Sequence, residues 1–304
     1  MTYNFLTADR LHPEAIRQAL STCFAVETSS VDVADAESDQ DRRNWDALVL
    51  CDFSGINGQL SLSLDIYVQE SVISQPTEAE AALRFAAATR TVVLYPAEEN
   101  IPSAYWAITP DMKTTRVRLS TTDDERPAYS IDAAESEIPQ FPDAHVTLLP
   151  EVIREHPVAI PATESFLAKA EAVLSPDKRE DATQPEKNDA DNLSDRARNS
   201  LAAWERMTRR MATGWPPSGG YPFDMYMNDL RARDDLAAIL AKYPEPVHHF
   251  LLESVHLVDS EFKRLTEPDR DHVIKRLTGA PQGDVTESDW WWYRKPIALP
   301  WSRQ

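Results

Sequence analysis

The sequence predicts an α+β fold followed by a mostly α-helical second domain, and three observations support this prediction. A stretch of strict period-two hydrophobicity lies before residue 70, helical patterns dominate after residue 196, and acidic residues are distributed unevenly between these regions. Strict alternation is typical of strands with one buried face, whereas apolar residues three and four apart are typical of helices. We therefore expect an N-terminal antiparallel sheet with helices on one face, followed by helices.

The negative charge of the chain, a net −19 from 50 acidic and 31 basic residues, is concentrated in its first part. Residues 1–174 contain 28 Asp and Glu against 12 Lys and Arg, whereas residues 196–304 contain 15 against 16. We predict an acidic α+β domain over 1–174, a disordered acidic linker over 175–195 and a helical domain over 196–304. The linker segment has one large apolar residue, Leu193, and cannot bury enough surface to offset its conformational entropy.

The first domain is expected to begin with a helix that starts near Thr7, where apolar residues recur at roughly helical spacing. The strongest local pattern is an antiparallel hairpin of strands over 46–53 and 59–68, joined at an Asn57-Gly58 turn. A second helix follows the capping box Thr77-x-x-Glu80. The remaining expected elements are strands over 91–95, 105–109, 115–120 and 145–149, and a closing helix over 163–174.

The second domain is expected to contain four helices, because clusters of Pro and Gly interrupt its helical periodicity. Thr266 is expected to be the N-cap of the last of them. The predicted helices cover 196–211, 223–242, 247–265 and 268–277.

An aromatic C-terminal segment follows these helices, with Trp290, Trp291, Trp292, Tyr293 and Trp301. One interpretation is a surface on which the first three of these residues bind a partner, because Trp and Tyr dominate the energetics of interfaces. The other is a C-terminal strap that packs over the helices. We favour the strap, since five exposed aromatic side chains would form an apolar patch prone to aggregation.

Candidate zinc ligands are found in one predicted helix, where His249, Glu253 and His256 fall at positions i, i+4 and i+7 beside His248. The spacing is not that of an HExxH motif, so we favour an ordinary, partly exposed helix face. Cys23 with a nearby His12 would be the candidate nucleophile. No family signature flanks either cysteine, and we favour core packing. We expect no catalytic residue, no metal and no cofactor.

Basic residues cluster in two places, and phosphate binding would use such residues. Because Asp234 and Asp235 lie beside the second cluster, we favour internal salt links or docking onto the acidic domain. The two clusters comprise Arg206, Arg209, Arg210, Arg231 and Arg233.

The acidic domain is expected to attract basic proteins and to repel nucleic acid and anionic membranes. There is no basic start followed by an apolar segment, and no apolar run of about 18 residues, so we expect a cytoplasmic protein. For each acidic run, the alternative to a partner contact is a solvated loop that keeps the protein soluble. The candidate partner contacts in these runs are Asp35, Glu37, Asp39, Asp41, Asp123, Asp124 and Glu125.

Three segments of the second domain, YMNDL from Tyr226, VDSEFKRLT from Val258 and WWWYRKP from Trp290, resemble short signatures of bacterial toxin-neutralising (immunity) proteins. The resemblance implies a non-enzymatic cytoplasmic inhibitor that binds a secreted toxin, and it assigns no functional residue. Many nucleases are basic, so an acidic surface would speed the encounter with such a toxin. The alternatives are an enzyme of unknown reaction with its site in the interdomain cleft, and an assembly or scaffold component.

Overall fold

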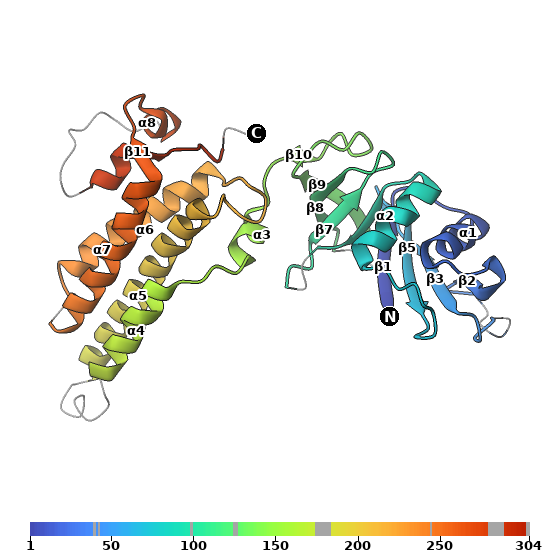
Figure 1. Ribbon diagram of the computed structural model, residues 1–304, viewed down its shortest axis with the longest axis horizontal. Coiled ribbons are helices and arrows are strands. Elements are labelled where there is room, and N and C mark those ends of the chain that lie inside the picture. The colour runs from blue at the N-terminus through green and yellow to red at the C-terminus, as the bar shows by residue number, and fades with distance from the viewer. Residues whose placement is uncertain are drawn as a thin grey trace. The chain divides into compact units, whose positions relative to one another are not determined.

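The computed structural model describes residues 1–38, 41, 43–97, 100–123, 127–173, 184–243, 245–278 and 289–301. The chain forms two compact units, Met1–Val152 and Ile153–Gln304. Unit 1 is built on a β-sheet and unit 2 on a helical bundle, which confirms the predicted α+β class (Figure 1). Among the described residues, no helix combines the length and apolar character that crossing a bilayer requires.

Unit 1 contains a ten-stranded sheet with the strand order β10-β9-β8-β7-β6-β1-β5-β3-β2, and β4 pairs with β9. Most neighbouring strands are antiparallel, but β2–β3, β4–β9 and β9–β10 are parallel, so the sheet is mixed. The elements are β1 (Thr2–Thr7), α1 (Pro13–Phe24), the 3-10 helix η1 (Thr28–Ser30), β2 (Val31–Asp35), β3 (Val49–Gly55), β4 (Asn57–Gly58), β5 (Leu62–Val68), α2 (Glu78–Thr89), β6 (Val93–Pro96), β7 (Ala104–Ile108), β8 (Thr114–Thr121), β9 (Ala128–Ala134) and β10 (His145–Val146).

The first residues of the chain form a central strand, and the expectation of a helix starting near Thr7 is wrong. Strand β1 lies between β5 and β6, and its alternate residues Tyr3, Phe5 and Thr7 are buried. Helix α1 begins only at Pro13, where the side chain of His12 accepts a hydrogen bond from the first turn. Residues 2–7 form a strand because they pair with β5 and β6, which are distant in the sequence, and a local pattern does not reveal such pairing.

The predicted hairpin is confirmed, because β3 and β5 pair antiparallel with Val49 opposite Val68 and Gly55 opposite Leu62. Its tip differs from a two-residue turn, since Asn57 and Gly58 pair with β9. Gly58 has φ +102°, and a Cβ atom there would lie 2.2 Å from the carbonyl oxygen of Tyr129. Only glycine allows the two backbones to approach this closely.

The other predicted strands of unit 1 correspond to β6, β7, β8 and β10, and the capping box of Thr77 and Glu80 begins α2 as expected. Strand β9 has no counterpart in the prediction. Its sequence, AYSIDAA, contains three alanines, which have low strand propensity and give little alternation.

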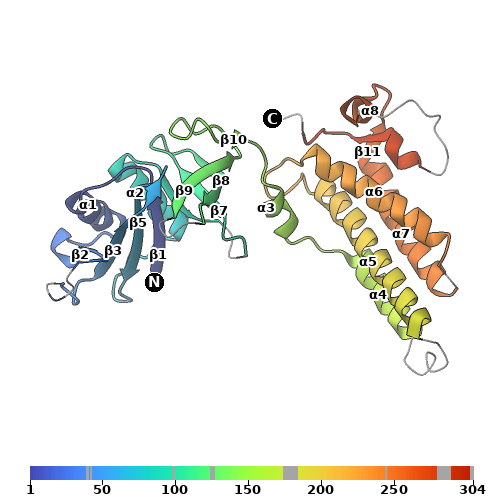
Figure 2. The same cartoon turned by 180° about the vertical axis from the view of Figure 1, so that it is seen from behind.

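Both faces of the sheet carry a hydrophobic core, but the two cores cover different strands. Helices α1 and α2 pack on one face, against side chains that include Phe5, Leu64 and Ile66. On the opposite face, a second core forms over β6 to β9, with Ile138 and Phe141 packed against it. On that face Leu6 of β1 also packs against the second core, whereas most of β5, β3 and β2 lies outside it, and Figure 2 shows these strands from behind.

Unit 2 is a bundle of the four helices α4 to α7, in which α5 packs against α6 and α7, and α4 against α7. A two-stranded sheet of β11 and β12 and a short helix α8 complete it. The elements from the end of unit 1 are α3 (Pro150–Glu155), α4 (Pro161–Val173), α5 (Gln184–Ala212), α6 (Phe223–Leu240), α7 (Val247–Leu265), β11 (Thr266–Pro268), α8 (Val273–Thr278), the 3-10 helix η4 (Trp290–Tyr293) and β12 (Arg294–Pro296).

The domain boundaries differ from the predicted ones at 174 and 196. Helix α4 was assigned to the first domain, but it packs against α5 and α7 in unit 2, and the units divide after Val152. Within the predicted linker, 175–183 lies outside the described residues and 184–195 is part of α5. A polar segment without a core of its own can still extend a helix that is anchored by tertiary packing further along.

Most predicted helices of unit 2 are confirmed, and α7 has the expected bounds. Thr266 is an exception, because it begins β11 and not a helix. Asp269 takes the expected capping role, since its carboxylate accepts hydrogen bonds from the backbone amides of Val273 (2.8 Å) and Ile274 (2.9 Å) at the start of α8. Strand β12 pairs with β11, which fixes the C-terminal segment on unit 2.

Candidate protein-binding surface

Negative charge remains concentrated in unit 1 when the observed boundary replaces the predicted one. Residues 1–152 contain 25 acidic and 10 basic residues, a net charge of −15, whereas residues 153–304 contain 25 and 21, a net charge of −4. Unit 1 therefore has the stronger negative field, which would attract cationic molecules.

The side of β1, β5, β3 and β2 that faces away from α1 and α2, which we call the open face, carries mainly polar and acidic side chains. Because side chains alternate along a strand, the residues between the buried ones point to this side. Asp65 and Tyr67 are exposed between the buried Leu64, Ile66 and Val68. The strand residues of the open face are Thr2, Asn4, Leu6, Asp32, Ala34, Leu50, Asp52, Ser54, Ser63, Asp65 and Tyr67, of which Leu6 packs against the second core.

Arg43 holds the connection between β2 and β3 against the open face. Its Nε donates to Asp32 at 2.9 Å, and its Nη1 forms an ion pair with Asp52. The Arg43 side chain is 3% exposed, whereas the Asp52 side chain is 40% exposed. Because β2 and β3 are adjacent and parallel, their connection must return along the sheet, and these ion pairs place it on this side.

Trp45 lies above Arg43, with the guanidinium carbon 4.9 Å from the ring centroid. It is 59% exposed, and Tyr67 is 45% exposed. The cation–π contact holds the indole in place while much of its surface remains accessible. Large aromatic side chains that are fixed yet exposed are the residues that most often dominate binding energy at protein interfaces.

Asp52 and Asp65 are direct cross-strand partners in the β3–β5 pair. Like charges directly opposite each other destabilise a sheet, so this arrangement has a local cost in folding free energy. Arg43 compensates for Asp52 but is not paired with Asp65, whose next cross-strand neighbour is Asn4. The open face therefore contains more negative than positive charge.

The first predicted acidic run lies partly in the described residues, next to the open face. Asp35 ends β2, and its carboxylate accepts a hydrogen bond from the backbone amide of Glu37 at 3.0 Å. Asp35, Glu37 and Asp41 are exposed, and Asp39 lies outside the described residues. These residues belong to the connection that Arg43 fixes, so they extend the negative charge at this edge of the sheet.

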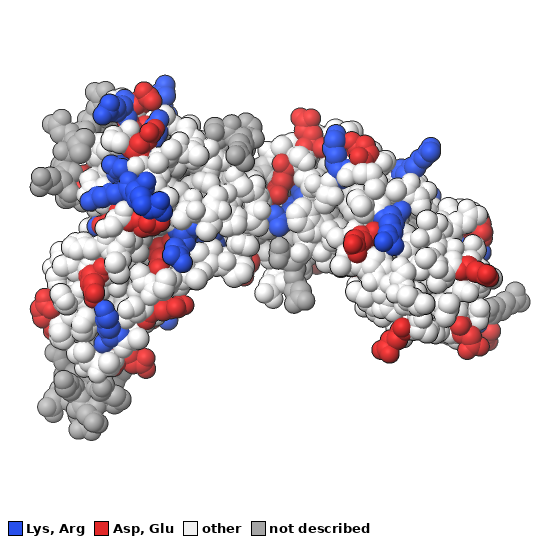
Figure 3. Space-filling view, in the orientation of Figure 1, with Lys and Arg blue, Asp and Glu red and all other residues white. Residues whose placement is uncertain are grey.

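The second predicted run is not brought together with the first. Asp123 follows β8, and in the sheet order β7, β6, β1, β5 and β3 stand between β8 and β2. Asp124 and Glu125 lie outside the described residues. On the side of unit 1 drawn in Figure 3, uncharged surface separates the acidic side chains. Of the two alternative runs, the first therefore lies beside the open face, whereas Asp123 of the second does not.

The tryptophans proposed as partner contacts pack within unit 2, as expected for a C-terminal strap. Trp291 is 2% exposed, so its assignment as a contact residue is wrong. The indole nitrogens of Trp291 (2.9 Å) and Trp292 (2.8 Å) both donate to the Asp234 carboxylate. Trp290 packs against Phe262 and Trp291. Buried tryptophans need such a hydrogen-bond acceptor, and Asp234 provides it from α6.

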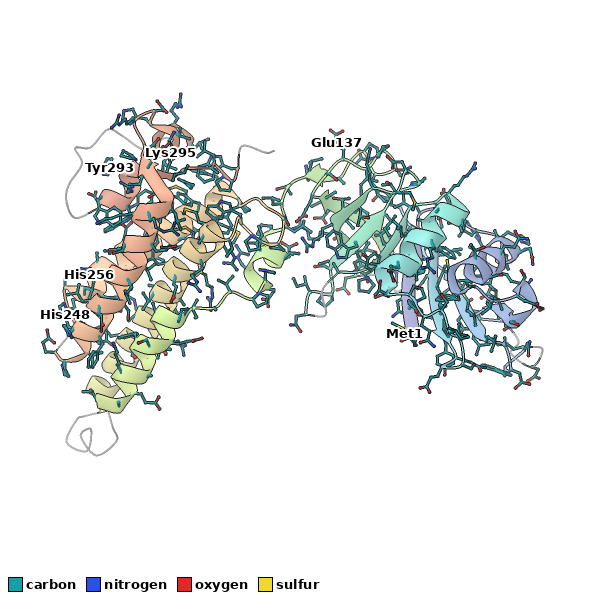
Figure 4. All side chains as sticks on the ribbon, in the orientation of Figure 1. Met1, Glu137, His248, His256, Tyr293 and Lys295 are labelled. Atoms are coloured by element: carbon teal, nitrogen blue, oxygen red, sulfur yellow. The ribbon has the colours of Figure 1, made fainter. Side chains whose placement is uncertain are left out.

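The histidines of α7 lie on an exposed surface, and His248 and His256 project from the helix (Figure 4). Glu253, the proposed carboxylate ligand, forms an ion pair with Lys169 at 2.7 Å. No group of three or more His, Cys, Asp or Glu side chains in the described parts of the chain is arranged to hold a metal ion. These observations favour the ordinary helix face over a zinc site.

Both cysteines are buried thiols in the core of unit 1. Burial raises the pKa of the Cys23 thiol to about 12, and Arg84 only partly opposes this effect. Burial also raises the pKa of Cys51. The thiolate is the reactive form of cysteine, so neither side chain is prepared for nucleophilic attack near neutral pH. His12 serves instead as the N-cap of α1.

Comparison of the chain with models of protein families, with curated proteins and with solved structures finds no match. The site must therefore be interpreted from its own geometry. Sequence reasoning predicted the solvated side of β5 but missed Arg43 and Trp45, the residues that organise the open face. A signal was present, since Arg42 and Arg43 interrupt an acidic segment just before Trp45 and indicate positive charge that needs partners.

Proposed function

We propose that the protein is a non-enzymatic inhibitor of the immunity type, which binds a basic protein through the open face of unit 1. The observation that carries the proposal is the combination of exposed aromatic and acidic side chains on one side of the sheet and on the connection that Arg43 holds against it. Trp45 and Tyr67 supply contact area, and Asp52 and Asp65 supply negative charge. This combination fits a partner with a cationic surface.

The physical roles of these residues differ. The net charge of −15 on unit 1 acts at long range and would raise the rate of encounter with a cationic partner. The aromatic side chains act only on contact and would determine the dissociation rate. Since Arg43 already fixes Trp45, less conformational entropy is lost when a partner packs on it.

A basic toxin that acts on nucleic acid is the partner that best fits this surface. An enzyme that binds a phosphate backbone needs a positive surface, and an acidic inhibitor can occupy that surface in place of the substrate. Such an inhibitor would act in the cytoplasm of a bacterium, where the toxin's substrate is found. The resemblance of the YMNDL, VDSEFKRLT and WWWYRKP segments to immunity proteins supports the same proposal.

The proposal is tested by capture of the partner from the native cell extract on the immobilised full chain. We expect a basic protein that binds at low salt and is released as salt rises from about 50 to 200 mM, because screening weakens long-range attraction. The variant Asp52→Lys/Asp65→Lys should lose this protein. The captured protein is then purified, and its activity is measured with and without the chain.

The matched control reverses two exposed acids elsewhere on unit 1, with Glu137→Lys/Asp143→Lys. Glu137 lies in the connection between β9 and β10, away from the open face (Figure 4). Both double variants change the net charge equally. A difference in how much captured protein they retain therefore depends on where the acidic residues lie and not on the total charge. Equal retention of the captured protein by both variants, or binding that does not respond to salt, would contradict the proposal.

A further inference from the structure

A pocket of about 300 Å³ in unit 2 brings together three guanidinium groups and one carboxylate. It lies among α3, α5 and α6 and has polar and apolar walls. The lining residues are Arg154, Ala203, Arg206, Arg210, Tyr221, Met225, Asn228 and Asp229. The pocket is separate from the open face and is not used by the proposed inhibitor function.

Arg210 is the innermost of the three arginines and is 4% exposed. Its Nη2 donates to the carbonyl oxygens of Ile153 (2.5 Å) and His156 (3.3 Å), which fixes the side chain against the end of α3. Its buried Nε atom has no hydrogen-bond partner among the described residues. A buried donor without a partner is costly, and an acceptor in the pocket would remove that cost.

Arg154 and Arg206 are exposed at the pocket and bring two further positive charges. In the described part of the chain, no ion pair joins Asp229 to any of the three arginines, although all three act on its charge through space. The guanidinium groups therefore surround the pocket without being neutralised by direct contact. Such an arrangement is suited to an anion with several oxygen atoms.

Asp229 lines the pocket, and Tyr221 donates a hydrogen bond to its carboxylate at 2.7 Å. Burial raises the pKa of Asp229 to about 7, although Tyr221 and the three arginines oppose this shift. The group therefore changes between an acceptor and a donor near neutral pH. A ligand in contact with it needs an oxygen that carries a proton or accepts one.

We propose that this pocket binds a phosphate group that retains one proton, with Arg154, Arg206 and Arg210 on its charged oxygens and Asp229 on its protonated oxygen. Hydrogen phosphate offers both kinds of oxygen at once. A carboxylate or sulfate ion carries no proton at pH 8 and would be repelled by the ionised Asp229. The chemistry of the lining residues thus favours phosphate over carboxylate and sulfate ions.

The test is titration calorimetry of the full chain with inorganic phosphate at pH 8, where Asp229 is ionised. The variant Arg206→Gln should weaken binding by about tenfold or more, because it removes one charge-assisted hydrogen bond. The control is Arg209→Gln, which removes the same charge from the same helix but lines a different cavity. Thermal denaturation of both variants checks that unit 2 remains folded.

Sulfate tests the role of Asp229, since it has the size and shape of phosphate without the proton. We expect sulfate to bind at least about tenfold more weakly than phosphate to the unchanged protein. In Asp229→Asn the two ions should bind about equally, because the repulsion is gone. Glycerol phosphate is a second test, because the second pKa of a phosphate monoester is about 6 and its phosphate carries no proton at pH 8, so it should bind as weakly as sulfate.

Three results would overturn the proposal. The first is the absence of saturable phosphate binding, and the second is equal loss of binding in Arg206→Gln and Arg209→Gln. The third is equal affinity of the unchanged protein for phosphate and sulfate. None of these results bears on the open face of unit 1, so the inhibitor function and the phosphate pocket can fail independently.

Discussion

The two units place their charged residues differently. Among the described residues, the buried charged side chains of unit 1 are those of Arg43 and Arg116, whereas unit 2 buries Glu205, Arg210, Arg233, Asp259 and Asp269. In unit 1 the surplus carboxylates lie at the surface, where water solvates them. In unit 2 the charges are part of the interior and must be paired there.

The buried charges of unit 2 mostly hold helices in place. Glu205 accepts hydrogen bonds from the amides of Ala162 and Thr163, both at 2.8 Å, at the start of α4. Asp259 accepts from Arg233 and from the indole of Trp204. Net charge is therefore a poor guide to how a unit uses its charges, because the nearly balanced unit 2 buries several of them between its helices.

The largest expected effect is the loss of Asp259, which would break this buried network. Asp259→Ala leaves Arg233 and the Trp204 indole without their acceptor and should lower the free energy of unfolding of unit 2 by about 3–5 kcal/mol. The corresponding change on the open face, Asp52→Ala, should cost less than about 1 kcal/mol, because that pair is partly solvated. Urea denaturation followed by tryptophan fluorescence measures the change in the free energy of unfolding for both variants. Similar changes would show that the two units do not differ in how they use charged side chains.

Two tryptophans give a second contrast. Trp291→Ala removes a buried side chain and should destabilise unit 2 by about 3–5 kcal/mol. Trp45→Ala removes an exposed one, so the free energy of unfolding should change by less than about 1 kcal/mol while partner binding is lost. Thermal denaturation and capture of the partner distinguish these effects. If Trp45→Ala still binds the partner, Trp45 is not part of the binding surface.

The pH dependence of unit 2 should reveal Asp229. Because its pKa in the folded protein, about 7, exceeds the ordinary value of 3.8, its contribution is most favourable at low pH. That contribution is lost as pH rises toward 7, at about 1.4 kcal/mol for each pH unit between the two pKa values. Melting temperatures at pH 5, 6, 7 and 8 should fall less in Asp229→Asn than in the unchanged protein. Parallel curves would show that Asp229 titrates normally.

The smallest expected effect is a gain in stability on the open face. Asp65→Asn removes the like-charge contact with Asp52 and should stabilise unit 1 by about 0.2–1 kcal/mol. The same change should weaken binding of a basic partner, since it removes an uncompensated negative charge. Urea denaturation and the salt-dependent capture assay check the two parts. A loss of stability would mean that Asp65 has a structural role.

The sequence by itself determined the α+β class, the β3–β5 hairpin, the capping box of α2 and the long helices of unit 2. Each of these is encoded within a few residues, as alternation in Leu62–Val68, as the Thr77 and Glu80 pair, or as helical periodicity. The excess of acid in the first part of the chain was also evident before any coordinates, because it depends on composition alone.

Tertiary structure decided the features that depend on residues distant along the chain. It placed β1 at the centre of the sheet, assigned α4 to unit 2, and set Arg43 between Asp32 and Asp52. The phosphate pocket joins Arg154 to Asp229 across 75 positions in the same way. No local pattern specifies such contacts, because they follow from how helices and strands pack and not from the propensity of any one segment.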